Sequence, residues 1–413
     1  MKAATLESKF PILAVEHDCI ISKDADITVA YKMELPELFT VTRNEYEAIH
    51  SAWAKAVKVL PNYSIVHRQD WFIEENYTPD IQRDDLSFLS RSFERHFNER
   101  PYLRHTSYLF LTKTTKERSR TQSNFTALTR NFIIPKEMQD KDTVTRFLES
   151  CDQFERIIND SGFVRITRMR KDEITGTENS AGIIEKYFSL SQEETTCLQD
   201  LTLGAAEMKV GDNCLCLHTL SDTDDLPGKV ATDMRYERLS TDRSDCRLSF
   251  AAPIGVLLTC NHIVNQYLFI DDPAENLKKF EKQARNMHSL SRYSRSNQIN
   301  REWIEEYLNE AHSLGLTSIR AHCNVLAWSD DRNRLKQIKN DVGSQLALME
   351  CKPRHNTVDT PTLFWAAIPG NAGDFPFEES YYTFIEQALC FFIGESCSRD
   401  SLSPFGIRMV DRL

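Results

Sequence analysis

Glycine is scarce in this chain, with 13 residues among 413, about 3% against a usual value near 7%. Loops that cradle phosphates need closely spaced glycines, because bare backbone N–H groups must approach the phosphate. No such cluster occurs, and the one Gly-Lys pair, Gly228-Lys229, is followed by valine. The sequence therefore lacks the G-x-x-x-x-G-K-[ST] loop of P-loop nucleotidases.

Long apolar runs are also missing. The longest, from Phe250 to Cys260, is interrupted by Pro253 and Gly255 and is shorter than the roughly 18–20 residues that span a bilayer. The N-terminus has no apolar h-region, so we expect no signal peptide. Eleven scattered cysteines favour reduced thiols and a cytosolic compartment. A net charge of −11 argues against a protein that coats nucleic acid through overall basicity.

Helix signals recur along the chain. Thr42 to Glu45 form a capping box before an apolar stripe that Pro61 ends, which predicts a helix. A second helix is predicted to begin at Asp272-Pro273, and a third apolar stripe runs from Trp303 to Leu314. Near the end, residues 361–371 read as a buried strand that leaves through a Pro-Gly turn, and residues 382–392 read as an amphipathic helix.

Strand patterns alternate with these helices. This spacing predicts an α/β (α+β) chain with mixed sheets, packed amphipathic helices and at least two subdomains, and without a P-loop motor domain. We expect an N-terminal α+β subdomain over residues 1–140, a middle mixed segment over 141–245, and a second α/β subdomain over 246–413.

Two patterns resemble known chemical sites. Residues 267–272, YLFIDD, have the form of a Walker B strand, but without a Walker A partner Asp271 and Asp272 are better explained as caps of the helix at Pro273. Cys214, Cys216 and His218 alternate on a predicted strand and would share one face, whereas a structural zinc ion needs four ligands. The sequence supplies no catalytic constellation, so we expect no enzyme activity, cofactor or metal in this chain.

One segment is strongly basic. Residues 91–136 contain ten Lys or Arg and three acids, with aromatic residues interleaved. This pattern is compatible with base stacking in a basic groove that binds single-stranded nucleic acid, or with a phosphate or acidic-lipid contact. The aromatic spacing also matches the core faces of a helix and a strand, so a protein-docking surface or a solvated face is the favoured interpretation. The candidate interaction patch consists of Arg91, Arg95, Arg104, Lys113, Lys116, Arg118 and Arg120.

Several longer strings resemble one family. They are LESKFPILAVEHDCIISKDADITVAYKMELPELFTV, FLSRSFERHFNERPYL, DLPGKVATDMRYERLSTDRSDCRLSFAAPIG and PTLFWAAIPGN. Together they resemble the N-terminal region of TraG proteins of bacterial conjugative transposons, members of the conjugation and type IV secretion ATPase family. The resemblance runs from Met1 to Leu413. Its most family-wide part is the signature Phe364, Trp365, Pro369, Gly370 and Asn371.

The resemblance implies a two-part protein. An N-terminal, non-catalytic domain would dock on conjugation-apparatus proteins at the cytoplasmic face of the inner membrane, and on its own ATPase domain, in a homo-oligomer that supports DNA transfer. ATP and Mg would bind only in a C-terminal motor, whose Walker A loop is expected after the segment SLSPFGIRMVDRL. None of the motor's catalytic residues has a matching position here. A single-stranded nucleic-acid-binding module and a hydrolase with a cryptic site remain the alternatives.

Overall fold

One large antiparallel sheet forms the centre of the fold. The computed structural model describes residues 6–76, 87–89, 91–92, 101–119, 135–193, 198–204, 207–290 and 294–397. Within these ranges the 13-stranded sheet has the order β1-β2-β3-β5-β4-β12-β13-β9-β8-β7, and β6, β14 and β15 pair at its sides with β3, β9 and β13. The remaining two strands, β10 and β11, form a separate ribbon.

The strands are β1 (Ile12–Glu16), β2 (Cys19–Ser22), β3 (Ile27–Glu34), β4 (Ser64–Asn76), β5 (Pro101–Lys113), β6 (Arg165–Arg168), β7 (Leu201–Leu203), β8 (Met208–Val210), β9 (Asn213–Leu220), β10 (Asp233–Arg235), β11 (Arg247–Ser249), β12 (His262–Ile270), β13 (Ser318–Ser329), β14 (Arg354–Asn356) and β15 (Tyr381–Phe384).

The α-helices are α1 (Leu6–Lys9), α2 (Arg43–Val59), α4 (Lys116–Ser119), α5 (Lys141–Asp160), α6 (Lys171–Thr175), α7 (Ile183–Ser189), α8 (Pro273–Leu290), α9 (Arg295–Leu314), α10 (Arg332–Leu348), α11 (Thr360–Ala366) and α12 (Ile385–Leu389). Short 3₁₀ turns are η1 (Lys136–Gln139), η2 (Thr223–Asp225), η3 (Ala252–Ile254), η4 (Ala372–Asp374) and η5 (Phe377–Glu379).

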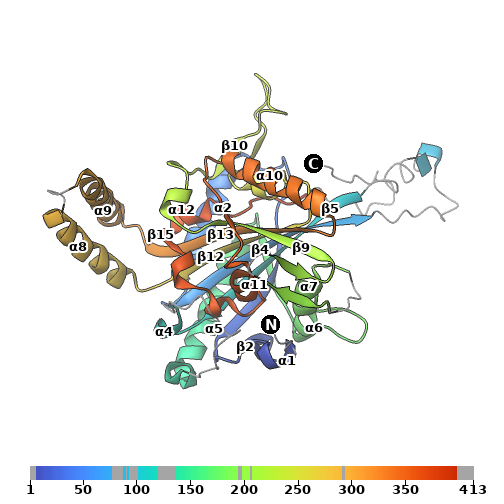
Figure 1. The fold of residues 1–413 in the computed structure, drawn as a ribbon, viewed down its shortest axis with the longest axis horizontal. Coiled ribbons are helices and arrows are strands. Elements are labelled where there is room, and N and C mark those ends of the chain that lie inside the picture. Colours follow the sequence, from blue (N-terminus) through green and yellow to red (C-terminus); the bar gives the residue numbers. More distant parts are fainter. Residues whose placement is uncertain are drawn as a thin grey trace.

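Helices cover both faces of the sheet (Figure 1). On one face α2, α5 and α12 share a core with β3, β4, β5 and β12, and α10 packs with β9 and β13 beside them. On the other face α6, α7 and α11 pack on the same central strands. Strands β12 and β13 are therefore buried along their whole length. Side chains on alternate sides of a strand face opposite ways, so the two cores lie back to back.

The mixed α/β class is confirmed, with differences in detail. The pairings within the 13-stranded sheet are antiparallel, where we expected mixed sheets. The predicted parts 1–140, 141–245 and 246–413 each contribute strands to that sheet. In the described ranges, no helix has the length and apolarity needed to cross a membrane.

Two local predictions were wrong. Residues 360–366 form the helix α11 rather than a strand, because Pro361 occupies the first turn and the following apolar side chains pack onto one face of the sheet. Residues 382–392 do not form one helix: β15 adds to the edge of β13, and only the short helix α12 follows. The helix predicted after Thr42 is confirmed as α2, with the expected capping box.

Candidate functional site

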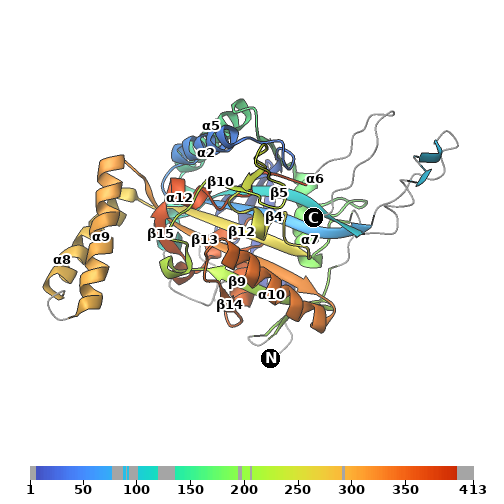
Figure 2. The same cartoon turned by 90° about the horizontal axis from the view of Figure 1, so that it is seen from above.

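A helical hairpin, α8 and α9, projects from one end of the sheet. It is inserted between the adjacent antiparallel strands β12 and β13, and both views show it extending away from the body of the molecule (Figures 1 and 2). Aromatic contacts hold its base. Tyr307 donates a hydrogen bond to Ser318 (2.7 Å) and stacks on Phe384 (centroids 4.4 Å apart), while Phe280 packs against Tyr382 (5.0 Å).

Helix α9 carries three exposed apolar side chains along its length. Trp303 is 60% exposed and Leu314 67% exposed, and Ile299 is also exposed. Spacings of four and eleven residues place the three on one stripe of an α-helix. The sequence places Trp303 and Leu314 in the buried stripe with Ala311, yet of these three only Ala311 is buried. Exposed apolar side chains that share one face of a helix are candidates for an interaction site, and Trp is a frequent anchor of protein interfaces.

The two helices of the hairpin differ in charge. Helix α8 carries four Lys or Arg and two Glu, whereas α9 carries two Arg and four Glu. Few of these charges are paired within the hairpin: Arg301 contacts Glu305 (2.6 Å), and His312 contacts Glu281 (3.9 Å). The hairpin therefore presents one basic helix beside one acidic helix, with an apolar stripe on the acidic one.

The predicted basic patch is dispersed. Arg95 and Arg120 lie outside the described residues, and Arg91 is exposed. Arg104, on β5, pairs with Glu75 (3.2 Å) at the surface. The structure therefore does not gather these cations into one groove within the part of the chain it describes.

Two lysines of the patch have internal roles. Lys113 is buried and donates a hydrogen bond to the carbonyl of Asn62 (2.6 Å), and burial lowers its pKa to about 8. Lys116 pairs with Glu275 at the start of α8 (2.5 Å). The second contact fastens the basic segment to the base of the projecting hairpin.

Arg118 is a buried structural cation. Its guanidinium contacts Asp24 (2.5 Å) and Asp26 (2.7 Å), both in the turn between β2 and β3. The carboxylates of Asp26, Asp24 and Asp374 raise the pKa of Arg118. The position of Gly373 depends on this contact, since a Cβ atom there would lie 2.2 Å from Asp26 Oδ2. Arg118, which the sequence places in a candidate nucleic-acid surface, instead joins its own segment to residues 24–26 and 373–374.

The signature residues form a buried segment that packs against the sheet. Phe364, Trp365 and Asn371 are almost fully buried, and Asn371 donates its amide to the carbonyl of Trp365 (2.9 Å). The Ile368 carbonyl accepts the backbone N–H of Asn371 (2.8 Å). With Pro369 and Gly370 (φ +89°) at its centre, this segment has the features of a type II turn. The predicted Pro-Gly turn is therefore confirmed.

Polar side chains of the sheet and of α7 hold the signature segment in place. Gln69 on β4 donates a hydrogen bond to the carbonyl of Ala367 (2.7 Å), and Tyr187 on α7 donates one to the carbonyl of Phe364 (2.8 Å). Asn265 accepts a further hydrogen bond from Gln69 (2.9 Å). The signature thus positions α11 against the sheet.

The two aspartates after β12 have different roles. Asp272 caps α8 as predicted, with its carboxylate accepting the N–H of Ala274 (3.0 Å). Asp271 does not cap the helix. It is buried and forms a two-pronged ion pair with Arg320 on β13 (2.7 and 3.2 Å), whose guanidinium also lies between the rings of Phe269 and Phe377. The buried carboxylate of Asp271 is engaged by Arg320 and is not available to bind a metal ion.

The predicted Cys214–Cys216–His218 face exists on β9, and all three side chains are buried. In the described ranges, no group of three or more His, Cys, Asp or Glu side chains is arranged to hold a metal ion. Burial raises the pKa of Cys216 to about 11, which disfavours the thiolate that zinc requires. His218 instead packs against His355 (centroids 5.3 Å apart).

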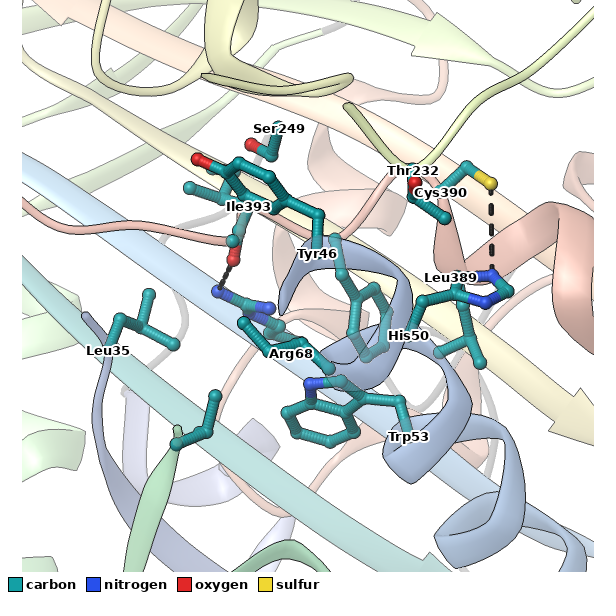
Figure 3. A pocket seen from close by; sticks show the side chains of 14 residues that line it. Leu35, Tyr46, His50, Trp53, Arg68, Thr232, Ser249, Leu389, Cys390 and Ile393 are labelled. Atoms are coloured by element: carbon teal, nitrogen blue, oxygen red, sulfur yellow. Dashed lines mark hydrogen bonds between the residues drawn. The ribbon is translucent and has the colours of Figure 1, made fainter. Parts of the chain in front are cut away.

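A polar network crosses the centre of the sheet, which sequence reasoning missed. Arg68 pairs with Asp70 (2.8 Å) and donates to the carbonyl of Ile393 (2.5 Å), and Asp70 also contacts His105 (3.0 Å). Figure 3 shows Arg68 pointing toward Ile393. The only sequence signal was the polar run His67 to Asp70 inside an apolar strand.

A small cavity lies beside this network. Tyr46, His50, Trp53 and Arg68 are among the residues that line it (Figure 3), and its volume is about 20 Å³. A space of that size accommodates about one water molecule. The cavity is therefore too small for an organic substrate, although the charged side chain of Arg68 lines it.

Comparison with known proteins identifies only the start of the chain. Residues 1–51 match a family described as a domain of unknown function, B. Theta Gene description (DUF3875). A comparison with curated proteins finds no match. The matched residues supply β1, β2, β3 and the first half of α2. They are thus an edge of the large sheet and contain both carboxylates that bind Arg118.

Proposed function

We propose that this chain is a non-catalytic docking and oligomerisation domain of a conjugative transfer ATPase of the type IV secretion family. The resemblance to TraG proteins motivates the family, and the projecting hairpin of α8 and α9 is the observation that supports a docking role. The pocket beside the central charged network is too small for a substrate. The hairpin carries an exposed apolar stripe of Ile299, Trp303 and Leu314.

The proposed occupant of this stripe is the hairpin of a second copy. The acidic helix α9 of one copy would lie against the basic helix α8 of the other, and a two-fold axis would repeat the same contact in reverse. Opposite charges placed in this way favour a specific register. The exposed ring of Trp303 would supply the apolar centre of the contact. A homo-oligomer in the cell is consistent with this geometry.

The test is the mass of the chain in solution. Analytical ultracentrifugation over a wide concentration range is expected to detect self-association that Trp303→Glu abolishes. The control is Leu348→Glu on α10, because Leu348 is also exposed (69%) and apolar but lies outside the hairpin. A chain that is monomeric at every concentration, or that associates equally well as Trp303→Glu, would refute oligomerisation through this surface.

Docking on the secretion apparatus needs a separate experiment. The chain is expected to co-purify with named inner-membrane components of its own conjugation system when they are expressed together. A folded chain that binds none of them would count against the docking role. Reading the gene beyond codon 413 tests the family itself: a Walker A loop within a few tens of codons supports the proposal, and a stop codon at that point contradicts it.

A further inference from the structure

A hollow on the surface of the sheet carries unpaired positive charge. It has a volume of about 320 Å³ and lies between α10, β14 and the start of α11. We call it the α10 hollow. Its lining includes the cationic residues Arg332, Lys336 and Lys339, and also His355. Its size falls within the range of small-molecule pockets. It is separate from the α8–α9 hairpin and does not depend on the proposed docking function.

The charges on α10 are arranged against the preference of a helix. The first turn has no acidic residue, although acids are favoured there by the helix dipole. Arg332 and Arg334 are neutralised by Glu207 (3.1 Å) and Glu74 (3.0 Å). Among the described residues, neither Lys336 nor Lys339 makes an ion pair. Two like charges three residues apart repel each other on a helix, so an anion between them would relieve an unfavourable arrangement.

The positive charge of Lys339 acts on two histidines in the wall of the hollow. His355 stands at the lining, and His218 lies directly behind it, 95% buried, with no hydrogen-bond partner for its Nδ1 atom among the described residues. Burial, His355 and Lys339 together lower the pKa of His218 to about 4. Burial and the same lysine lower the pKa of His355. Neither imidazole carries a negative charge, so neither histidine compensates the positive charge of Lys339.

The remaining walls combine hydrogen-bonding and apolar groups. Asn356, Thr357 and Thr360 supply amide and hydroxyl groups on one side, and Met208 and Leu335 supply apolar surface on the other. Glu207 is the one acid that lines the hollow, and it is engaged by Arg332. A ligand with a compact anionic group and a small apolar body matches this lining.

We propose that the α10 hollow is a binding site for a phosphate group, carried by a small organic phosphate or present as free phosphate, with Lys336, Lys339 and His355 as its ligands. Lysine binds phosphate as a point charge, and the imidazole and hydroxyl groups add directed hydrogen bonds. The adjoining apolar wall would accept the organic part of an ester.

Calorimetric titration of the intact chain with inorganic phosphate, pyrophosphate and a nucleoside monophosphate tests the site. We expect saturable binding that weakens at least tenfold in Lys336→Ala/Lys339→Ala. The matched control is Lys55→Ala/Lys171→Ala, which removes two exposed lysines outside both the hollow and the hairpin and is expected to bind as the parent does. Far-UV circular dichroism and the melting temperature verify that both double variants fold.

Each arm of the titration has a defined meaning. Tighter binding of the monophosphate than of inorganic phosphate identifies an ester as the ligand, and equal binding identifies the phosphate group alone. The absence of saturable binding by the parent would overturn the proposal. So would an equal response to chloride at matched ionic strength, or an equal loss of binding in the Lys55→Ala/Lys171→Ala control.

Discussion

Replacing Arg118 with methionine is expected to lower the free energy of unfolding by about 3–5 kcal/mol, the usual cost of removing one partner of a buried ion pair. The structure supplies the reason. Asp24 and Asp26 lie 2.5 and 2.7 Å from the guanidinium, and the side chains of all three residues are at most 9% exposed. Methionine keeps much of the packing but removes the guanidinium that neutralises these two buried carboxylates. Since a domain is typically stable by only 5–15 kcal/mol, a loss of this size is easily measured.

The control lies in the same basic segment. Arg104→Met removes an ion pair with Glu75 in which the arginine is 54% exposed, and exposed pairs of this kind contribute about 0–1 kcal/mol. Urea unfolding followed by tryptophan fluorescence is expected to show a large fall in midpoint for Arg118→Met and little change for Arg104→Met. Adding Asp24→Asn and Asp26→Asn to Arg118→Met should restore much of the loss, because no unpaired charge then remains buried.

The pH dependence of Arg118→Met provides a second test. Burial raises the pKa of Asp26, and Arg118 opposes that rise. In the variant the pKa of Asp26 rises further, so the folded state holds a proton that the unfolded state has released above about pH 4. Stability is then lost as the pH increases above that value. The gap between variant and parent should therefore be smallest in acid and widest near neutral pH.

One outcome would refute this reasoning. Arg118→Met could keep the parent's stability and instead weaken binding of single-stranded DNA, with a shallower dependence of affinity on salt. That result would make Arg118 a phosphate contact and would favour the nucleic-acid module over a structural ion pair.

Two further substitutions test the interior of the fold. Burial raises the pKa of Glu395 to about 7. Its carboxyl therefore lowers the free energy of unfolding by about 3 kcal/mol between pH 4.3 and 7. Glu395→Gln should remove this pH dependence in unfolding experiments, whereas Glu378→Gln, at an exposed position, should keep it. Gly370→Ala should cost more than about 1 kcal/mol, because φ is +89° and the added Cβ would lie 2.5 Å from Ile20 Cγ2. Gly228→Ala, where no atom lies within 4 Å, should leave the melting temperature unchanged.

Local signals explain which parts of the fold could be predicted. Helix α2 follows from a capping box and a helical stripe within about 20 residues, and Asp272 caps α8 through the residue two positions ahead. The strand predicted for α11 failed because a short apolar run buried on all sides has no distinguishing period. Pro361 at the start of that run was the available helix signal.

The candidate sites depended on contacts that the sequence does not encode locally. Arg118 is buried because the chain places Asp24 and Asp26 beside it from more than 90 positions away. Trp303 belongs to an apolar stripe of ordinary appearance, and only the position of the hairpin beyond the edge of the sheet leaves it exposed. Charge counts and periodicity identify these side chains as notable, but the tertiary arrangement decides whether each is structural or available to a partner.

The N-terminal segment that matches a known family is inseparable from the rest of the fold. Its strand β3 pairs with β5 and β6, its Ile20 packs where a Cβ on Gly370 would clash, and its Asp24 and Asp26 bind Arg118. A fragment cut after residue 51 would expose these surfaces and would lose the contact of Asp24 and Asp26 with Arg118. The matched residues therefore complete the sheet on which the buried signature packs. Any function of this segment must be studied in the intact chain.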